Sequence, residues 1–275
     1  AGVLGMVTAP TYNLEDYKVD YEAILNAENT PLVNRATDGL YRPGSTFKTI
    51  TATAGLNEQI ITGNSTYFCG HTYHFKDHDY NCTGSHGDIA VTQALRVSCN
   101  IFFYDVGRIT GIDLIAQYAS DYGLGGEMGL EIGRGIKKGY IACPETFEER
   151  GLQWQAGNVI QAAIGQSDTY VTPLQMAAQA MTIANKGVRY ETYMVDSVYT
   201  YNMEELVSRT KPVKAAVIED KTGYTFDTVT KGMVEAGAFE AYTYPTLSEY
   251  YTDSYLLTDL PEKTAIKTGT PQMTS

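Results

Sequence analysis

The sequence predicts an α/β fold, strictly α+β, in which a sheet is flanked by helices. Two observations lead to this prediction. Strand-like patterns stand at both ends of the chain, and helical periodicity dominates its middle. The chain has 275 residues, of which 43% are hydrophobic and 19% are charged, a composition typical of a globular protein with a sizeable core.

Three segments carry strand patterns. Residues 1–8 are apolar and end at the turn Ala9-Pro10, which predicts a buried strand at the start of the chain. Residues 187–201 are rich in Val, Tyr and Thr, which favour strands. Residues 264–270 alternate in the way that a strand requires.

The helical patterns lie between these strands. Apolar positions recur at helical spacing from Ser45 to Gly55. The same spacing predicts helices over residues 88–97, 101–108, 113–122, 172–186 and 225–236. Residues 62–87 are polar and contain all four His, which indicates a long loop or hairpin.

The net charge of −12 disfavours nucleic acid as a partner, because the chain would repel its phosphates. The longest uncharged stretch, residues 169–185, is interrupted by polar residues, and we find no segment that would span a bilayer. Neither an initiator Met nor a signal-like apolar run opens the chain. We therefore expect a piece of a longer protein.

A candidate nucleophile stands at Ser45, in the sequence Pro-Gly-Ser-Thr-Phe-Lys. Residues three apart on a helix share a face, so the amine of Lys48 can reach the Ser45 hydroxyl. A serine hydroxyl is a weak nucleophile until a base removes its proton, and a lysine with a lowered pKa can be that base. A second Ser-x-x-Lys, at Ser208 and Lys211, runs into Pro212 and loses helical geometry, so we interpret it as coincidence.

Two shorter motifs also suggest a site. Ser98 and Asn100 form a Ser-x-Asn sequence in the break between two predicted helices, where side chains can project into a cleft. A Lys-Thr-Gly-Thr sequence at residues 267–270 combines a cation for a carboxylate with a glycine that lets a peptide approach. Another Lys-Thr-Gly, at Lys221, precedes a predicted helix, and we interpret it as a turn.

The three motifs occur in the order known from penicillin-binding proteins and serine β-lactamases. Over nearly its whole length the chain resembles the transpeptidase domain of a class B penicillin-binding protein. Four further stretches carry the resemblance: Gly2 to Tyr12, Asn34 to Lys48, Gly84 to Gly87, and Ile164 to Gln175. Ser167 departs from the pattern, since the family usually has Gly at this position.

The resemblance implies a β-lactamase/transpeptidase-like fold, with a central, mainly antiparallel sheet flanked by helices and an all-helical lobe. We expect one domain, truncated at both ends, whose sheet lobe covers about residues 1–56 and 187–275. The helical lobe would cover about residues 57–186, and the cleft would lie between the lobes.

The resemblance also implies acyl transfer on peptidoglycan at the extracytoplasmic face of a bacterial cell membrane. Lys48 would take the proton of Ser45, which attacks a D-Ala-D-Ala stem peptide, and the amine of a second stem peptide would resolve the acyl-enzyme. Ser98 and Asn100 would relay protons and position the substrate. The oxyanion would lie between the backbone N–H groups of Ser45 and Thr270. Lys267, Thr268 and Thr270 would hold the substrate carboxylate, and Gly269 is the fourth implied substrate-binding residue. β-Lactams would acylate the same serine, and cell-wall synthesis proteins are the expected partners.

The cysteines offer a metal site. Cys69, Cys82, His86 and Cys99 supply three thiolates and one imidazole, a tetrahedral donor set for zinc. Some elongation-type relatives are similar in carrying metal ligands near these positions. The zinc would be structural, since the acyl chemistry requires no cofactor. A Cys69–Cys82 disulfide and free thiols are the alternatives, and we interpret Cys143 as a packing residue.

Other functions remain alternatives at this stage. A serine β-lactamase or D,D-carboxypeptidase shares the three motifs, and a non-catalytic β-lactam sensor would share the fold. The sequence contains no clear water-activating group for a β-lactamase. A Ser-His-Asp hydrolase is disfavoured, because no Gly-x-Ser-x-Gly occurs and the His residues crowd into one segment.

Overall fold

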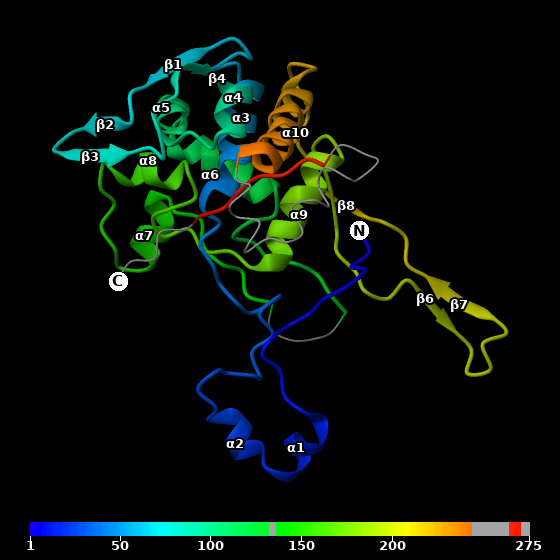
Figure 1. Cartoon of the computed structure of the whole chain (residues 1–275). Coiled ribbons are helices and arrows are strands. Elements are labelled where there is room, and N and C mark those ends of the chain that lie inside the picture. Colours follow the sequence, from blue (N-terminus) through cyan, green and yellow to red (C-terminus); the bar gives the residue numbers. More distant parts are fainter. Residues whose placement is uncertain (132–135, 244–263, 271–275) are drawn as a thin grey trace.

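The structure is a computed structural model that describes residues 1–131, 136–243 and 264–270. Its helices pack around α3, while two hairpins and an N-terminal lobe extend outward (Figure 1). The helices are α1 (Leu14–Val19), α2 (Tyr21–Leu25), the short 3₁₀ helix η1 (Gly44–Phe47), α3 (Lys48–Asn57), α4 (Val91–Arg96), α5 (Asn100–Thr110), α6 (Ile112–Asp121), α7 (Pro144–Glu149), α8 (Asn158–Ala162), α9 (Pro173–Ala184) and α10 (Thr225–Thr243). The strands are β1 (Thr66–Cys69), β2 (Thr72–Phe75), β3 (His78–Asn81), β4 (Gly87–Ala90), β5 (Val188–Tyr190), β6 (Ser197–Tyr199), β7 (Leu206–Arg209) and β8 (Lys214–Val217).

The prediction of a mixed fold of helices and strands is confirmed. The strands of the described residues pair as antiparallel two-stranded sheets: β1 with β4, β2 with β3, β5 with β8, and β6 with β7. The long polar segment predicted over residues 62–87 therefore contains β1, β2 and β3. The helix predicted over residues 88–97 begins later than expected, because residues 88–90 belong to β4, which pairs with β1, and α4 starts at Val91.

The strands predicted at the two ends are wrong for the described residues. Residues 1–8 make one parallel bridge, from Gly2 to Tyr193, and residues 264–270 lie in no ladder. A strand requires a partner backbone. In the C-terminal segment, the Ile266 N–H instead donates to the Met233 carbonyl of α10, at 3.0 Å. The rest of the expected sheet lobe, residues 244–263 and 271–275, lies outside the described residues.

Helix α3 forms the centre of the core. Every one of its residues is buried, and it packs against α5, α6 and α10. Its small residues permit close approach: a Cβ on Gly55 would lie 3.1 Å from a Val106 methyl group of α5. This packing fixes the start of α3, where Lys48 stands directly after η1.

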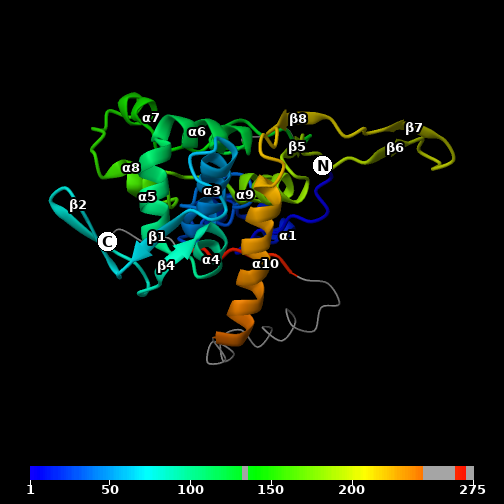
Figure 2. The same cartoon turned by 90° about the horizontal axis from the view of Figure 1, so that it is seen from above.

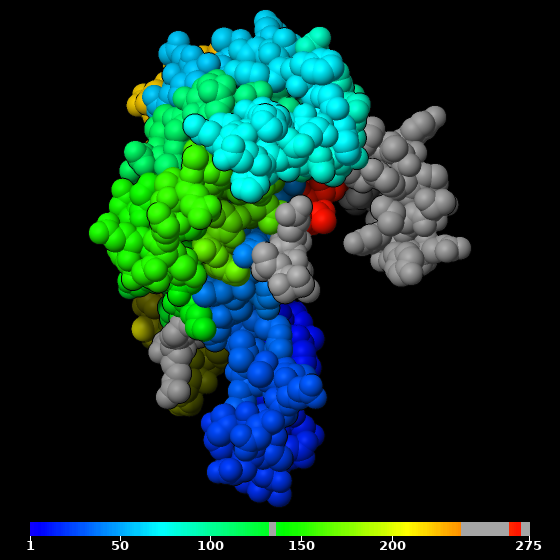
Figure 3. All heavy atoms as spheres, turned by 90° about the vertical axis from the view of Figure 1, so that its left-hand side faces the viewer, coloured from blue at the N-terminus to red at the C-terminus, as the bar shows by residue number. Residues whose placement is uncertain are grey.

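Helices α1 and α2 lie outside this core. Helices α1 and α2, which were not predicted, form a projecting lobe (Figures 1 and 3), and neither contains a buried residue. Their starts are capped by Asn13 and Asp20, whose side chains accept from backbone N–H groups. None of the described helices is long and apolar enough to cross a bilayer.

The C-terminal segment reaches the core beside α10. Viewed from above, residues 264–270 cross α10 close to α4 (Figure 2). A small residue allows this contact, because a Cβ on Gly237 would lie 2.5 Å from the Thr264 carbonyl oxygen. The last motif is thereby brought to the end of α3 that begins with Lys48.

Candidate functional site

The three sequence motifs meet at the start of α3. Ser45 lies on η1, Lys48 is the first residue of α3, and Ser98 lies in the turn between α4 and α5. The Lys48 Nζ is 3.2 Å from the Ser98 Oγ, and the Lys267 Nζ donates to the same oxygen at 2.9 Å. One hydroxyl therefore joins two lysines from segments more than 200 residues apart.

Lys48 is buried and held by acceptors from the second motif. Its Nζ donates to the Ser98 carbonyl at 2.8 Å and to the Asn100 Oδ1 at 2.6 Å. Burial, and then the positive charge of Lys267, lower the pKa of Lys48 to about 7. A lysine with this pKa is partly neutral near pH 7 and can accept a proton.

The turn that carries Ser98 has a strained backbone. Ser98 has a φ of 53°, in the left-handed region that non-glycine residues rarely occupy. Cys99 follows as the cap of α5 and accepts from the Phe102 N–H at 3.4 Å. Strain of this kind persists only where the surroundings hold it, and here it points Ser98 and Asn100 toward Lys48.

The loop after α8 contacts the turn that carries Ser45 and fixes its backbone. The Gly44 N–H donates to the Gly165 carbonyl at 3.0 Å. Gly165 has a φ of 71°, and a Cβ there would lie 2.2 Å from the Gly44 oxygen. Only glycine fits this position without moving the backbone that carries Ser45.

Gln179 is a supporting residue that the sequence analysis missed. From α9, its amide donates to the Thr46 carbonyl at 3.0 Å and to the Thr49 Oγ1 at 2.8 Å. It therefore ties η1 to the first turn of α3. The sequence contained an indication of this role, because Gln179 is a polar residue on the buried face of a largely apolar helix. A buried amide requires hydrogen-bond partners.

The last motif lies against the Ser45 turn. A Cβ on Gly269 would lie 3.1 Å from the Thr46 methyl group and 3.3 Å from the Pro43 carbonyl oxygen. The Gln166 amide donates to the Thr270 carbonyl at 3.2 Å. In Figure 3 the segment (red) reaches the surface below the residues of β1 to β4 (cyan), and Gly269 and Thr270 are exposed.

The second Ser-x-x-Lys and the second Lys-Thr-Gly of the sequence lie away from this site, in agreement with their interpretation as a coincidence and a turn. Ser208 belongs to the exposed strand β7, and Lys211 follows it outside any helix. Lys221 stands in the turn before α10 and pairs with Glu58. Neither match contributes to the site at the start of α3.

The predicted metal ligands come together beside the Ser98 turn. The ligand atoms of Cys69, Cys82, His86 and Cys99 all lie within 4.8 Å of one another. The His86 Nδ1 is 3.4 Å from the Cys69 Sγ and 3.6 Å from the Cys82 Sγ, and the Cys82 and Cys99 sulfurs are 3.8 Å apart.

These distances can be compared with those around zinc. With Zn–S bonds of about 2.3 Å and Zn–N bonds of about 2.0 Å, a tetrahedral site separates two sulfurs by about 3.8 Å and a sulfur from a nitrogen by about 3.5 Å. Three of the donor separations, at 3.4, 3.6 and 3.8 Å, are close to these values, and all the ligand atoms lie within 4.8 Å of one another. The donor set therefore fits a zinc ion in its chemistry.

One thiol of the cluster has a lowered pKa. The contact with the Cys99 thiol and hydrogen bonds from backbone N–H groups, Asn100 among them, lower the pKa of Cys82, whereas the same contact raises the pKa of Cys99. All four cysteines of the chain are free thiols, so the structure does not contain the alternative Cys69–Cys82 disulfide. Cys143 is buried at the start of α7, away from the cluster, as expected of a packing residue.

Comparison with known proteins gives a consistent result. The family described as "Penicillin binding protein transpeptidase domain" matches residues 1–275. The peptidoglycan D,D-transpeptidase MrdA of Escherichia coli is 34% identical over 198 residues. The match covers 68% of this chain and 31% of that protein, so the chain spans about a third of the length of this relative.

Solved structures agree with this comparison. A Pseudomonas aeruginosa PBP2 structure, in complex with WCK 5153, is 27% identical, with a TM-score of 0.73, and the match covers 85% of this chain and 54% of that one. A structure on the coordination of polymerization and crosslinking by a peptidoglycan synthase complex has a TM-score of 0.77 at 26% identity, covering 97% of this chain and 43% of that one.

Proposed function

Since the chain belongs to the penicillin-binding protein transpeptidase family, we propose that it acts as a serine D,D-transpeptidase on peptidoglycan. Its substrates would be stem peptides that end in D-Ala-D-Ala, and β-lactams would acylate the same serine. The observation that carries this proposal is the contact of Lys48 and Lys267 with the one Ser98 hydroxyl, beside the turn of Ser45.

Acylation begins at Ser45. Neutral Lys48 takes the hydroxyl proton, and the Ser45 oxygen attacks the carbonyl carbon of the D-Ala-D-Ala bond. The backbone N–H groups of Ser45 and Thr270 stabilise the oxyanion. Ser98, which hydrogen-bonds to both lysines, passes the proton to the departing D-Ala amine.

Lys267 provides the charge that selects the substrate. Its Nζ contacts the Thr268 hydroxyl at 3.1 Å as well as Ser98, and these groups together bind the terminal carboxylate of the stem peptide. The same charge helps to keep Lys48 neutral, because a second cation nearby disfavours protonation. Substrate binding and base activation therefore depend on one residue.

The lowered pKa of Lys48 predicts that the acylation rate depends on pH. Below a pKa of about 7 Lys48 is protonated and cannot accept the Ser45 proton, whereas above it the amine is neutral. Acylation by a penicillin should therefore slow as the pH falls through 7, approaching about tenfold per pH unit in the acidic limb. Stopped-flow acylation rates would give the profile, with circular dichroism to verify the fold at each pH. A flat profile across this range would exclude Lys48 as the base.

The proposed activity can be tested by intact mass measurement after incubation with a penicillin. We expect one stable adduct, which peptide mapping locates on Ser45, and none with Ser45→Ala. Rapid loss of the adduct with turnover of the penicillin would indicate a β-lactamase instead. Absence of any adduct from folded protein would refute the proposed chemistry.

We also propose that Cys69, Cys82, His86 and Cys99 bind a structural zinc ion. When bound, zinc would supply a rigid cross-link between the hairpins after α3 and the start of α5. Three observations support the proposal: three donor separations lie between 3.4 and 3.8 Å, the pKa of Cys82 is lowered, and the Asn100 N–H donates to the Cys82 sulfur at 3.2 Å. The cluster thus holds the backbone of a residue that contacts Lys48.

Metal removal tests this site. Protein purified without chelator should contain one zinc per chain by elemental analysis. A strong chelator should lower its melting temperature and slow penicillin acylation about tenfold, because the Ser98 turn loses its support. Cys69→Ser should lose the zinc, whereas Cys143→Ser, which changes a buried cysteine outside the cluster, should keep it. Equal zinc content in these two variants would contradict the assignment.

The substrate defines where the chain would act. Peptidoglycan lies outside the cytoplasmic membrane, so we propose an extracytoplasmic location and other cell-wall synthesis proteins as partners. The likeness to MrdA and to a structure of a peptidoglycan synthase complex supports this proposal.

A further inference from the structure

The hairpin of β6 and β7 extends from the core as a projecting arm (Figures 1 and 2). Its two strands are joined by residues 200–205 and, in the described part of the chain, pack chiefly against each other. All residues of β7 are exposed. A two-stranded hairpin without a further strand or helix to pack on is only marginally stable in water. A surface that covers this arm would therefore stabilise it.

Apolar side chains lie on both faces of the arm. Tyr199 and Leu206 are paired across the hairpin, share one face, and are 45% and 51% exposed. Val198, the next residue of β6, points to the opposite face and is 44% exposed. Near the tip, Tyr201 is fully exposed and Met203 is 70% exposed. Exposed apolar groups that gather on one projection are typical of an interaction site.

The charges of the arm are balanced and ordered along β7. Residues 194–217 contain three acidic and three basic residues, whereas the whole chain carries a net charge of −12. Glu204 and Glu205 precede the apolar centre of β7, and Arg209 and Lys211 follow it. An antiparallel copy of the same strand places its basic end beside this acidic end. Opposite charges that face each other across two strands are favourable, so β7 is complementary to itself.

The outer edge of β7 is available for such pairing. Within the described residues β7 pairs only with β6, so its other edge carries unpaired backbone groups. The Thr210 N–H donates to the Asp196 carbonyl at 2.8 Å, on the side of β6. Since neighbouring residues of a strand direct their backbone groups to opposite sides, those of Arg209 point to the open edge. Such an edge is a template for another strand.

We propose that β7 pairs with β7 of a second copy of this chain, antiparallel and about a two-fold axis at Val207. In this register Glu205 of each copy lies opposite Arg209 of the other, at the two ends of the ladder. Leu206 of each copy lies opposite Ser208 of the other. The two-fold axis closes the assembly as a dimer, because both edges are then used. A lipid surface or an unrelated protein would not require this order of charges.

Sedimentation equilibrium tests the dimer, because the chain of 30.2 kDa and its dimer differ twofold in mass. The ionic strength should be about 0.15 M, which screens the long-range repulsion between two acidic chains. We expect a reversible equilibrium with a Kd of about 10–100 µM, since an interface of one short ladder is small.

Two charge reversals and their mixture identify the contact. Glu205→Arg and Arg209→Glu should each raise the Kd about tenfold, because like charges then face each other at both ends of the ladder. In an equal mixture of the two variants every new charge faces an opposite one, so a mixed dimer should form about as tightly as the wild-type dimer. Arg209→Glu also loses the ion pair with Asp196, which mixing cannot repair. Recovery in the mixture therefore reports the contact between copies.

Glu15→Arg and Lys18→Glu are the matched controls. Both residues are exposed on α1 and pair with each other, and the substitutions change the net charge by the same amounts. They should leave the Kd unchanged, alone and mixed. Circular dichroism of every variant verifies the fold.

Three results would overturn the inference: a chain that stays monomeric, a dimer that the two reversals leave unchanged, or a mixture no tighter than either variant alone. If the monomeric chain cosediments with vesicles of phosphatidylglycerol and phosphatidylethanolamine, the arm binds a lipid surface instead. If it does not, a different protein covers the arm. The measurement does not depend on acylation of Ser45, so its outcome is independent of the proposed function.

Discussion

Replacing Lys48 by methionine should lower the rate of penicillin acylation of Ser45 by about 10³-fold, within the range that a general base contributes. Methionine matches the length of the lysine stem but cannot accept a proton. It also removes the hydrogen bonds to the Ser98 carbonyl and the Asn100 amide oxygen. Pre-steady-state mass spectrometry of the adduct would measure the rate.

The stability of this variant must be measured as well, because Lys48 is fully buried. Loss of the amine leaves two acceptors without this donor, which costs about 1–3 kcal/mol, and removes a buried polar group, which offsets part of that cost. Lys211→Met is the matched control, since Lys211 belongs to the other Ser-x-x-Lys match and is exposed. Retention of fast acylation in folded Lys48→Met would show that another group takes the proton.

Local spacing accounts for what the sequence predicted well. Ser45 and Lys48 are three residues apart, so helical spacing alone places them on one face. The contact of Lys48 with Ser98 joins residues 50 positions apart, and only the resemblance to a known family predicted it. The cysteine cluster was also predictable. Three of its ligands lie in one segment of hairpins, and Cys99 begins the helix that packs beside it.

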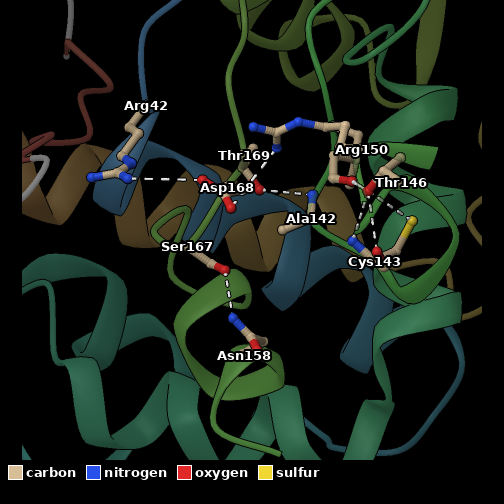
Figure 4. A network of polar contacts seen from close by, with 10 residues as sticks. Arg42, Ala142, Cys143, Thr146, Arg150, Asn158, Ser167, Asp168 and Thr169 are labelled. Carbon is tan, nitrogen blue, oxygen red and sulfur yellow. Dashed lines mark hydrogen bonds and ion pairs between the residues drawn. The ribbon is translucent and has the colours of Figure 1, made fainter. Parts of the chain in front are cut away.

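Long-range contacts account for what it did not predict. The donation from Gly44 to Gly165 joins residues 121 positions apart, and no pattern near either residue indicates it. The same holds for the ion pair of Arg42 with Asp168 (Figure 4), whose charged atoms are 4.0 Å apart. Strand pairing is non-local too, so the apolar pattern of residues 1–8 predicted a strand where the structure has one bridge.

Ser167 shows how a departure from the family pattern acquires a physical meaning. Its φ is 59°, in the left-handed region, where the glycine usual in the family meets no steric cost. Serine tolerates this conformation with help from the Asn158 amide, which donates to its hydroxyl at 3.0 Å. The sequence identified the departure, but only the backbone angle explains it.

Gly165→Ala should give the second large effect, on stability and activity together. The left-handed backbone costs alanine about 1 kcal/mol. The new methyl group would also lie 2.2 Å from the Gly44 oxygen and 2.6 Å from the Phe47 Cβ, so the Ser45 turn must shift. We expect a total loss of about 3 kcal/mol in the free energy of unfolding and at least a 10²-fold loss in acylation, because a displacement of about 1 Å suffices for that.

Gly151→Ala separates the clash from the backbone strain. Gly151 has a φ of 67°, close to that of Gly165, but nothing lies within 4 Å of the Cβ position. This variant should lose only about 1 kcal/mol and keep its acylation rate. Denaturant unfolding and adduct formation measure both quantities for the two variants. If Gly165→Ala resembled Gly151→Ala in both, the contact between the loop after α8 and the turn of Ser45 would not determine the position of the nucleophile.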